Sequence, residues 1–153
     1  MYFVDREKIE QTLVYMETLE KELQTFTKVE QLPDKLALER IAYVMIESII
    51  DVGNSMIDGF IMRDPGGYTD IIDILEDEKV LNPENATALK SIVELRKQLV
   101  QNYSEVNHST LLEQFTAHQS AIQQFPLDIR RYLVEELGPV SAFLPNKEEL
   151  GKK

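Results

Sequence analysis

Cysteine is absent from the 153-residue chain, which excludes disulfide bonds, thiolate nucleophiles and thiolate metal sites. The first residues also lack the basic start and apolar run of a secretory signal. No stretch approaches the roughly 18 consecutive apolar residues of a membrane-spanning helix. We therefore expect a cytoplasmic protein that does not bind a membrane.

Common catalytic motifs are absent as well. The chain has no glycine-rich phosphate loop, no His-Glu-x-x-His motif and no Gly-x-Ser-x-Gly nucleophile elbow. Its two histidines, His108 and His118, have no second histidine at helical spacing with which to hold a metal. We expect surface or capping roles for both, and neither a metal nor a cofactor.

Positive charge is scarce, because the net charge is -11. Such a chain repels phosphate backbones, so we expect no general affinity for DNA. Residues 88–104 are the exception, since they contain three cations, Lys90, Arg96 and Lys97, and one anion, Glu94. Their local charge of +2 leaves a net charge of -13 for the rest of the chain. On charge alone, a chance excess on a solvated helix face is the simpler interpretation of this segment.

Glycine and proline number six each, and they separate long runs with helical spacing. Strand-like alternation rich in Val, Ile and Thr is missing. An apolar content of 43% in 153 residues suits one globular domain. We therefore predict an all-α protein, an antiparallel bundle of about five helices, with its domain at residues 1–137 and a loosely held tail at residues 138–153.

Proline residues and capping side chains set the expected helix boundaries. Asp34 is a candidate cap for the second helix and Asn82, followed by Pro83, for the fourth, while Asn107 or Ser109 suits the fifth. The expected helices span residues 5–27, 34–62, 69–78, 83–101, 108–125 and, after a bend or break at Pro126, 127–137. The first carries an apolar stripe formed by Ile9, Leu13, Met16, Leu19 or Glu20, and Leu23.

Apolar residues cover most of the circumference of the second helix. They are Ile41, Val44, Met45, Ile46, Ile49, Ile50, Val52, Met56, Ile57, Phe60 and Ile61. A helix of this kind must be buried nearly all round, and a bundle of this size has trouble enclosing it alone. Helices from a second copy would cover it, so we predict a two-fold homodimer.

The same helix carries a polar stripe within a sector of about 80°. The stripe consists of Arg40, Tyr43, Glu47, Asp51, Asn54 and Asp58. Buried carboxylates need partners, so Glu47 and Asp51 must face a cation, a metal or water. Carboxylate metal sites in four-helix bundles use Glu-x-x-His pairs, which this chain lacks. Pairing with Arg40 and with Arg96 is therefore favoured.

In the fourth helix, Arg96 and Tyr103 are seven residues apart and share a face if the helix continues that far. Gln101 lies about 140° round the helix from Arg96. Arg96 and Tyr103 could line one cleft, and Gln101 can join it only if the end of the helix loosens or the symmetric subunit completes the site. The alternative, which spacing alone favours, makes Arg96 a buried ion-pair partner and Tyr103 an ordinary packing residue.

Residues 93–103 resemble the hallmark of HepT-like toxins in the HEPN superfamily, in which an Arg is followed after four residues by His-x-Tyr. Similar residues recur elsewhere over roughly residues 36–125. They are Glu39-Arg40, Glu47 with Asp51, Gly67-Tyr68, and residues 105–108. The resemblance implies a HEPN-like four-helix core and a homodimer.

The resemblance further implies metal-independent RNA cleavage and a minimal nucleotidyltransferase antitoxin as partner. Arg96 would polarise the scissile phosphate, and Tyr103 would be the residue that the antitoxin modifies with nucleotide. The family's catalytic His is replaced by Gln101, whose amide does not exchange a proton near neutral pH. Lys97 replaces the usual polar residue after the Arg.

Two functional hypotheses follow from this replacement. In the first, the chain is a HepT-like toxin whose endoribonuclease activity is weak unless another residue, such as His108, supplies the proton transfer. In the second, the same dimer is catalytically inactive and binds a nucleotide, RNA or the nucleotidyltransferase.

Overall fold

The computed structural model describes residues 3–138, which form seven helices and, within that range, no strand. The helices are α1 (Arg6–Leu23), α2 (Leu32–Gly59), α3 (Tyr68–Asp77), α4 (Pro83–Glu94), α5 (Arg96–Val100), α6 (His108–Ala117) and α7 (Gln119–Leu137). The predicted all-α class is confirmed. The predicted tail lies, apart from Gly138, outside the described residues. In the described part, no helix is both long and apolar enough to cross a bilayer.

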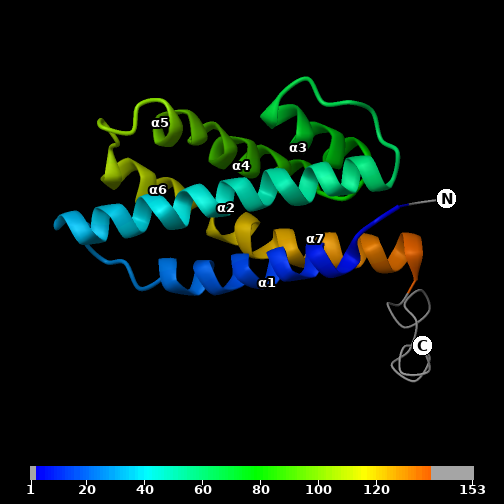
Figure 1. The fold of residues 1–153 in the computed structure, drawn as a ribbon, viewed down its shortest axis with the longest axis horizontal. Coiled ribbons are helices and arrows are strands. Elements are labelled where there is room, and N and C mark those ends of the chain that lie inside the picture. The colour runs from blue at the N-terminus through cyan, green and yellow to red at the C-terminus, as the bar shows by residue number, and fades with distance from the viewer. Residues whose placement is uncertain (1–2, 139–153) are drawn as a thin grey trace, which may run out of the picture.

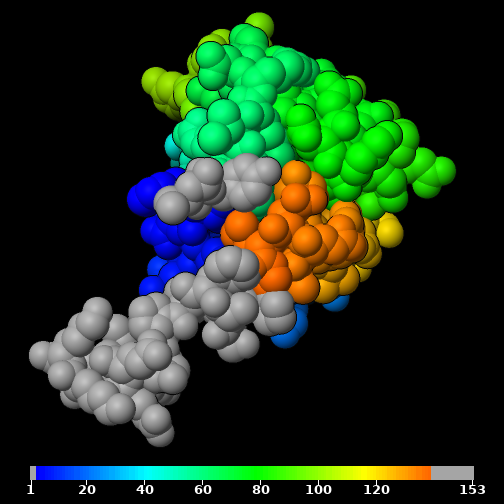
Figure 2. Space-filling view, turned by 90° about the vertical axis from the view of Figure 1, so that its right-hand side faces the viewer, coloured from blue at the N-terminus to red at the C-terminus, as the bar shows by residue number. Residues whose placement is uncertain are grey.

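Four helices form the core of the bundle. Helices α1, α2, α4 and α7 lie along the long axis of the molecule, and helices that are neighbours in this ring run antiparallel (Figure 1). Helix α3 packs on α2 and α4, and the short α5 and α6 close one end of the bundle. The antiparallel arrangement agrees with the prediction, and a view turned by 90° shows the end of α7 beside the start of α1 (Figure 2).

One chain is enough to enclose α2. This helix packs against α1, α3, α4, α5 and α6, and its apolar side chains from Leu38 to Ile57 are mostly buried within the single chain. The premise that a bundle of this size could not cover α2 is therefore wrong, because α3 and α6 add cover outside the four core helices. The homodimer itself stays a prediction.

The start of α2 differs from the prediction. The helix begins at Leu32, and Pro33 lies in its first turn, so Asp34 is a helical residue and not the cap. Proline is tolerated there because the first N–H groups of a helix have no partner within the helix. The hydrogen bonds of the helix begin with the Lys35 N–H, which donates to the Gln31 carbonyl at 3.0 Å.

Two helix breaks also differ from the predictions. The expected helix of residues 83–101 divides at Leu95 into α4 and α5, and α5 ends at Val100. Asn107 caps α6 by accepting from the Thr110 N–H at 3.1 Å, as one of the two predicted alternatives has it.

The second break falls at His118, between α6 and α7, and not at Pro126 as predicted. Helix α7 continues through Pro126. Pro126 is buried in α7 and lies beside Met16 of α1, so burial of the proline ring offsets the backbone hydrogen bond that proline cannot make.

Close packing of α2 on α3 depends on Gly53. A Cβ atom at this position would overlap the Ile71 Cγ2 methyl, which is attached to a branched and therefore stiff side chain. Alanine improves helix propensity by about 1 kcal/mol, but overpacking in a core costs about 1–3 kcal/mol. We expect Gly53→Ala to lower the free energy of unfolding in a urea titration.

Gly66→Ala is the matched control, because its Cβ would meet nothing nearer than the Asp70 Oδ2 atom, at an ordinary 3.5 Å. The change in its unfolding free energy should stay within about 0.5 kcal/mol. A Gly53→Ala protein as stable as the wild type would contradict the packing described here.

Candidate functional site

Arg96 is the first residue of α5 and is held by a carboxylate from α2. Its Nε donates to the Glu47 Oε1 atom at 2.6 Å, and the exposed fractions of the two side chains are 23% and 27%. The predicted pairing of Glu47 with Arg96 is confirmed. This hydrogen bond is the main reason why the pKa of Arg96 lies above its usual value, so the guanidinium stays charged at every physiological pH.

Tyr68 completes the surroundings of Arg96. The guanidinium carbon lies 4.5 Å from the centroid of the Tyr68 ring, within the range of a cation–π contact. Tyr68 is the first residue of α3, so three helices converge on one cation. Sequence spacing does not reveal this contact, because the two residues are joined only through the packing of α3 on α2 and α4.

The two Nη groups of Arg96 keep their donors available. Within residues 3–138, the Nε–Glu47 bond is the hydrogen bond that engages this side chain. Arginine carries five N–H donors in a planar fork, and the outer edge of that fork matches two oxygens of a phosphate. A half-buried, fixed cation with an unused bidentate edge is therefore suited to bind an oxyanion.

Asp70 stabilises the turn that leads into Tyr68. Its carboxylate accepts from both terminal nitrogens of Arg63, at 2.8 and 2.9 Å, and from the Gly66 N–H at 2.7 Å. Arg63, as the first cause, and the Gly66 N–H lower the pKa of Asp70 from 3.8 to about 2. The ionised side chain thus ties the connection after α2 to the first turn of α3.

Replacing Asp70 with Asn should change how stability depends on pH. Because the pKa of Asp70 is depressed in the folded protein, its contribution is complete above the ordinary value near 3.8 and is lost as pH falls towards 2. We expect wild type to be more stable than Asp70→Asn at pH 6, and the difference to shrink between pH 4.5 and 2. Urea unfolding across this range measures it.

Asp64→Asn is the control, since Asp64 is exposed in the same connection and forms no ion pair within the described chain. A stability difference between wild type and Asp70→Asn that stays constant from pH 6 to pH 2 would contradict the role given to Asp70.

Gln101 and Tyr103 lie in a turn that follows α5. The Gln101 N–H donates to the Lys97 carbonyl at 2.8 Å, and Glu105 N–H donates to Asn102 at 3.0 Å, which closes the turn. Gln101 is exposed and Tyr103 is 71% exposed. The condition for a shared helical face with Arg96 is not met, because the helix ends at Val100. The alternative of Tyr103 as a packing residue is wrong too.

The polar stripe of α2 is not a buried row. Arg40 is exposed, with its guanidinium carbon 6.0 Å from the Tyr43 ring centroid, and no ion pair within residues 3–138 joins it to Glu47. Asp51 is exposed in a hollow that it shares with Lys8, on α1, and whose lining does not include Arg96. Because α2 presents successive turns of the stripe to different neighbours, Glu47 is the stripe residue that pairs with Arg96, and Tyr43 adds a weaker electrostatic contribution to the pKa of Arg96.

His108 forms a second pair at the same end of the bundle. Its Nε2 lies 2.8 Å from the Glu39 Oε2 atom, and both side chains are mostly buried. Glu39 and Glu47 are eight residues apart on α2, so about 12 Å of helix axis separates the His108 pair from the Arg96 pair. Within one chain, His108 is thus held by Glu39 and not placed beside Arg96.

Comparison with known proteins gives the family. Residues 7–129 match the family model described as Ribonuclease HepT-like. YutE of Bacillus subtilis strain 168, named as a candidate RNase, is 51% identical over 143 residues, which cover 94% of this chain and 99% of YutE. A solved structure of YutE, described as a cytosolic protein of unknown function, matches with a TM-score of 0.90 and covers 94% of this chain and 100% of that one.

A more distant solved structure shares the fold. It is the tri-AMPylated HEPN toxin of Shewanella oneidensis in complex with its MNT antitoxin, with a TM-score of 0.72 at 18% identity over 80% of this chain and 96% of that one. The family model and the identity to YutE confirm the resemblance to HepT-like proteins that the sequence indicated. The chain belongs to the HepT-like family of the HEPN superfamily.

Proposed function

We propose that this chain is the toxin of a toxin–antitoxin system, a homodimeric and metal-independent endoribonuclease that binds the scissile phosphate of RNA at Arg96. The observation that carries the proposal is the unused outer edge of the Arg96 guanidinium, which Glu47 fixes at 2.6 Å and Tyr68 covers on one face. A cation fixed before the substrate arrives needs no reorganisation to stabilise charge that develops on the phosphate.

In the proposed reaction, Arg96 binds the scissile phosphate and water carries the protons. The ribose 2′-oxygen attacks phosphorus, its bond to phosphorus forms as the bond to the leaving 5′-oxygen breaks, and the 2′-proton passes to water. The leaving oxygen takes a proton from water in turn. Gln101 can donate a hydrogen bond but cannot carry either proton. Because general acid–base catalysis contributes about 10²–10⁴-fold, wild-type cleavage should be slow.

The antitoxin in this proposal is a minimal nucleotidyltransferase, the partner type with which the Shewanella toxin was solved. Tyr103 is its target here, because a hydroxyl on a side chain that is 71% exposed in a turn is accessible to a transferring enzyme. The cytosol is the proposed setting, as for YutE.

The test incubates purified wild-type chain with labelled tRNA and mRNA in EDTA, beside Arg96→Ala. The proposal expects slow cleavage by wild type and none by Arg96→Ala. Cleavage that both proteins share equally would assign the activity to a contaminant or to another site.

A second candidate function is a catalytically inactive dimer that binds RNA, a nucleotide or the nucleotidyltransferase. Gln101 is the observation that favours it, because this residue removes proton transfer while leaving the Arg96 edge intact. It predicts no cleavage by wild type but loss of RNA or partner binding in Arg96→Ala. If neither cleavage nor binding depends on Arg96, both candidate functions fail.

The homodimer has its own test. A light-scattering mass near twice the chain mass of 17.7 kDa at micromolar concentration is expected. A mass near 17.7 kDa would refute the dimer.

A further inference from the structure

Glu20 is a buried carboxylate that the Arg96 site does not use. It lies on the apolar stripe of α1, where the sequence allowed either Leu19 or Glu20, and it is 7% exposed. Its Oε2 atom accepts from the Gln24 Nε2 at 2.7 Å, and its Oε1 atom accepts from the amides of Gln119 and Gln123 at 3.1 and 3.2 Å. Three amides, one from the C-cap of α1 and two from α7, thus converge on one carboxylate.

No cation neutralises this carboxylate within residues 3–138. Its neighbour in sequence, Lys21, is exposed and forms no ion pair with it. Arg130, on the facing helix α7, is already paired with Glu10 and Glu17 at 2.8 Å each. A buried anion without a positive partner is unfavourable, and amide donors solvate it without cancelling its charge.

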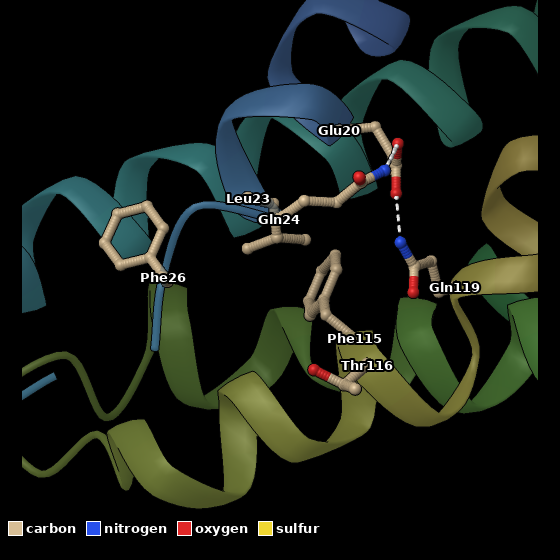
Figure 3. Close-up of a pocket in the computed structure, with 7 residues that line it drawn as sticks. All are labelled: Glu20, Leu23, Gln24, Phe26, Phe115, Thr116 and Gln119. Carbon is tan, nitrogen blue, oxygen red and sulfur yellow. Dashed lines mark hydrogen bonds between the residues drawn. The ribbon is translucent and has the colours of Figure 1, made fainter. Parts of the chain in front are cut away.

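A cavity opens beside the carboxylate. This Glu20 cavity has a volume of about 310 Å³ and is bounded by polar groups of Glu20, Gln24 and Gln119 and by apolar groups that include Phe26 and Phe115. Figure 3 shows the Glu20 carboxylate between the amides of Gln24 and Gln119, with the Phe115 ring nearby. The volume lies at the lower end of the range of about 300–1,000 Å³ for ligand pockets.

The composition of the Glu20 cavity defines the ligand it fits. An ionised carboxylate has about four acceptor positions, and the three amides occupy three of them. One position is left for an N–H donor, and a positive charge on that donor would complement the anion. Phe26, which is partly exposed, can contact such a cation or the apolar chain that carries it, whereas the Phe115 ring is buried. We propose that the Glu20 cavity binds an ammonium group carried on a short apolar chain.

Two sources carry this chemistry, a free alkylamine and the side chain of a lysine. The experiment therefore titrates the intact protein with n-butylammonium in one arm. The other arm uses Nα-acetyl-lysine-amide, a lysine with blocked backbone ends and a free side-chain ammonium group. Backbone amide signals of Gln24 and Gln119 in NMR spectra report binding, at constant ionic strength. Binding in either arm that shifts these signals supports the proposal and identifies the source, and binding in neither arm overturns it.

Charge recognition is tested with Glu20→Gln, which keeps the shape of the side chain. Its affinity for n-butylammonium should fall about tenfold or more. Glu22→Gln is the matched control, because Glu22 is an exposed acid two residues away on the same helix, and its affinity should match wild type. Equal affinity in Glu20→Gln and wild type overturns the proposal.

The neutral probe n-butanol keeps the test independent of how the variant folds. It has the same chain without the charge, so wild type should bind it about tenfold more weakly than n-butylammonium. Equal affinity for the two probes would show that the cavity does not distinguish a charged ligand from a neutral one, and would contradict the proposal. None of these readouts depends on RNA cleavage, so the Arg96 proposal and this one can fail separately.

Discussion

A Gln101→His variant is expected to cut RNA in EDTA about 10²–10⁴-fold faster than wild type, because an imidazole restores the proton transfer that an amide cannot perform. The turn after α5 holds Gln101 through its backbone, by a hydrogen bond to Lys97, and leaves its side chain exposed. An imidazole should therefore fit without repacking. Single-turnover rates with end-labelled tRNA near pH 7 measure the gain.

Asn102→His is the matched control for that gain. Asn102 is the next residue in the turn and is equally exposed, so the variant adds an imidazole to the same surface at the wrong position. Its rate should stay within about threefold of wild type, since general catalysis requires hydrogen-bond reach of the reacting oxygen. A gain shared by both variants would mean that a nearby imidazole suffices, and no gain in Gln101→His would remove Gln101 from the reaction.

Arg96→Ala should have the second largest effect. Placed in the Gln101→His background, it is expected to lower the cleavage rate about 10²–10³-fold, a loss typical of removing a fixed donor to a developing oxyanion. Arg96→Lys should recover only part of this rate, because lysine keeps the charge but cannot offer a bidentate edge. The same single-turnover assay compares the three proteins.

Stability must be measured alongside that comparison. Removing Arg96 leaves the partly buried Glu47 without its partner, which costs about 1–3 kcal/mol. Urea titrations should therefore show that each variant is folded at the assay temperature. Full activity in a folded Arg96→Ala protein would contradict the assignment of Arg96 as the phosphate ligand.

Local signals predicted much of the fold. Asn82 with Pro83 starts α4 as expected, and the Asn82 side chain accepts from the Asn85 N–H at 2.7 Å. The ion pair between Glu47 and Arg96 was also predictable, since a half-buried carboxylate must find a cation and few cations lie nearby. The first inference depends on capping chemistry within a few neighbouring residues. The second depends on the general rule that a partly buried carboxylate pairs with a cation.

Tertiary packing explains what the sequence could not predict. The end of α5 at Val100 separates Tyr103 from the face of Arg96, although no proline or glycine marks that end. Pro126, a strong local signal, does not end α7, because the surrounding core holds the helix together. The contact of Tyr68 with Arg96 likewise exists only because α3 packs across α2.

The central claim is that Arg96 binds a phosphate of RNA, and it is tested most directly by RNA affinity. Fluorescence anisotropy with a labelled tRNA, at one fixed salt concentration, would compare wild type, Arg96→Ala and Lys97→Ala. Lys97 is the adjacent, exposed cation, so its removal changes net charge equally without touching the Glu47–Tyr68 surroundings. We predict at least a tenfold loss of affinity for Arg96→Ala and a much smaller loss for Lys97→Ala. Equal losses in the two variants, or unchanged affinity in Arg96→Ala, would contradict the claim.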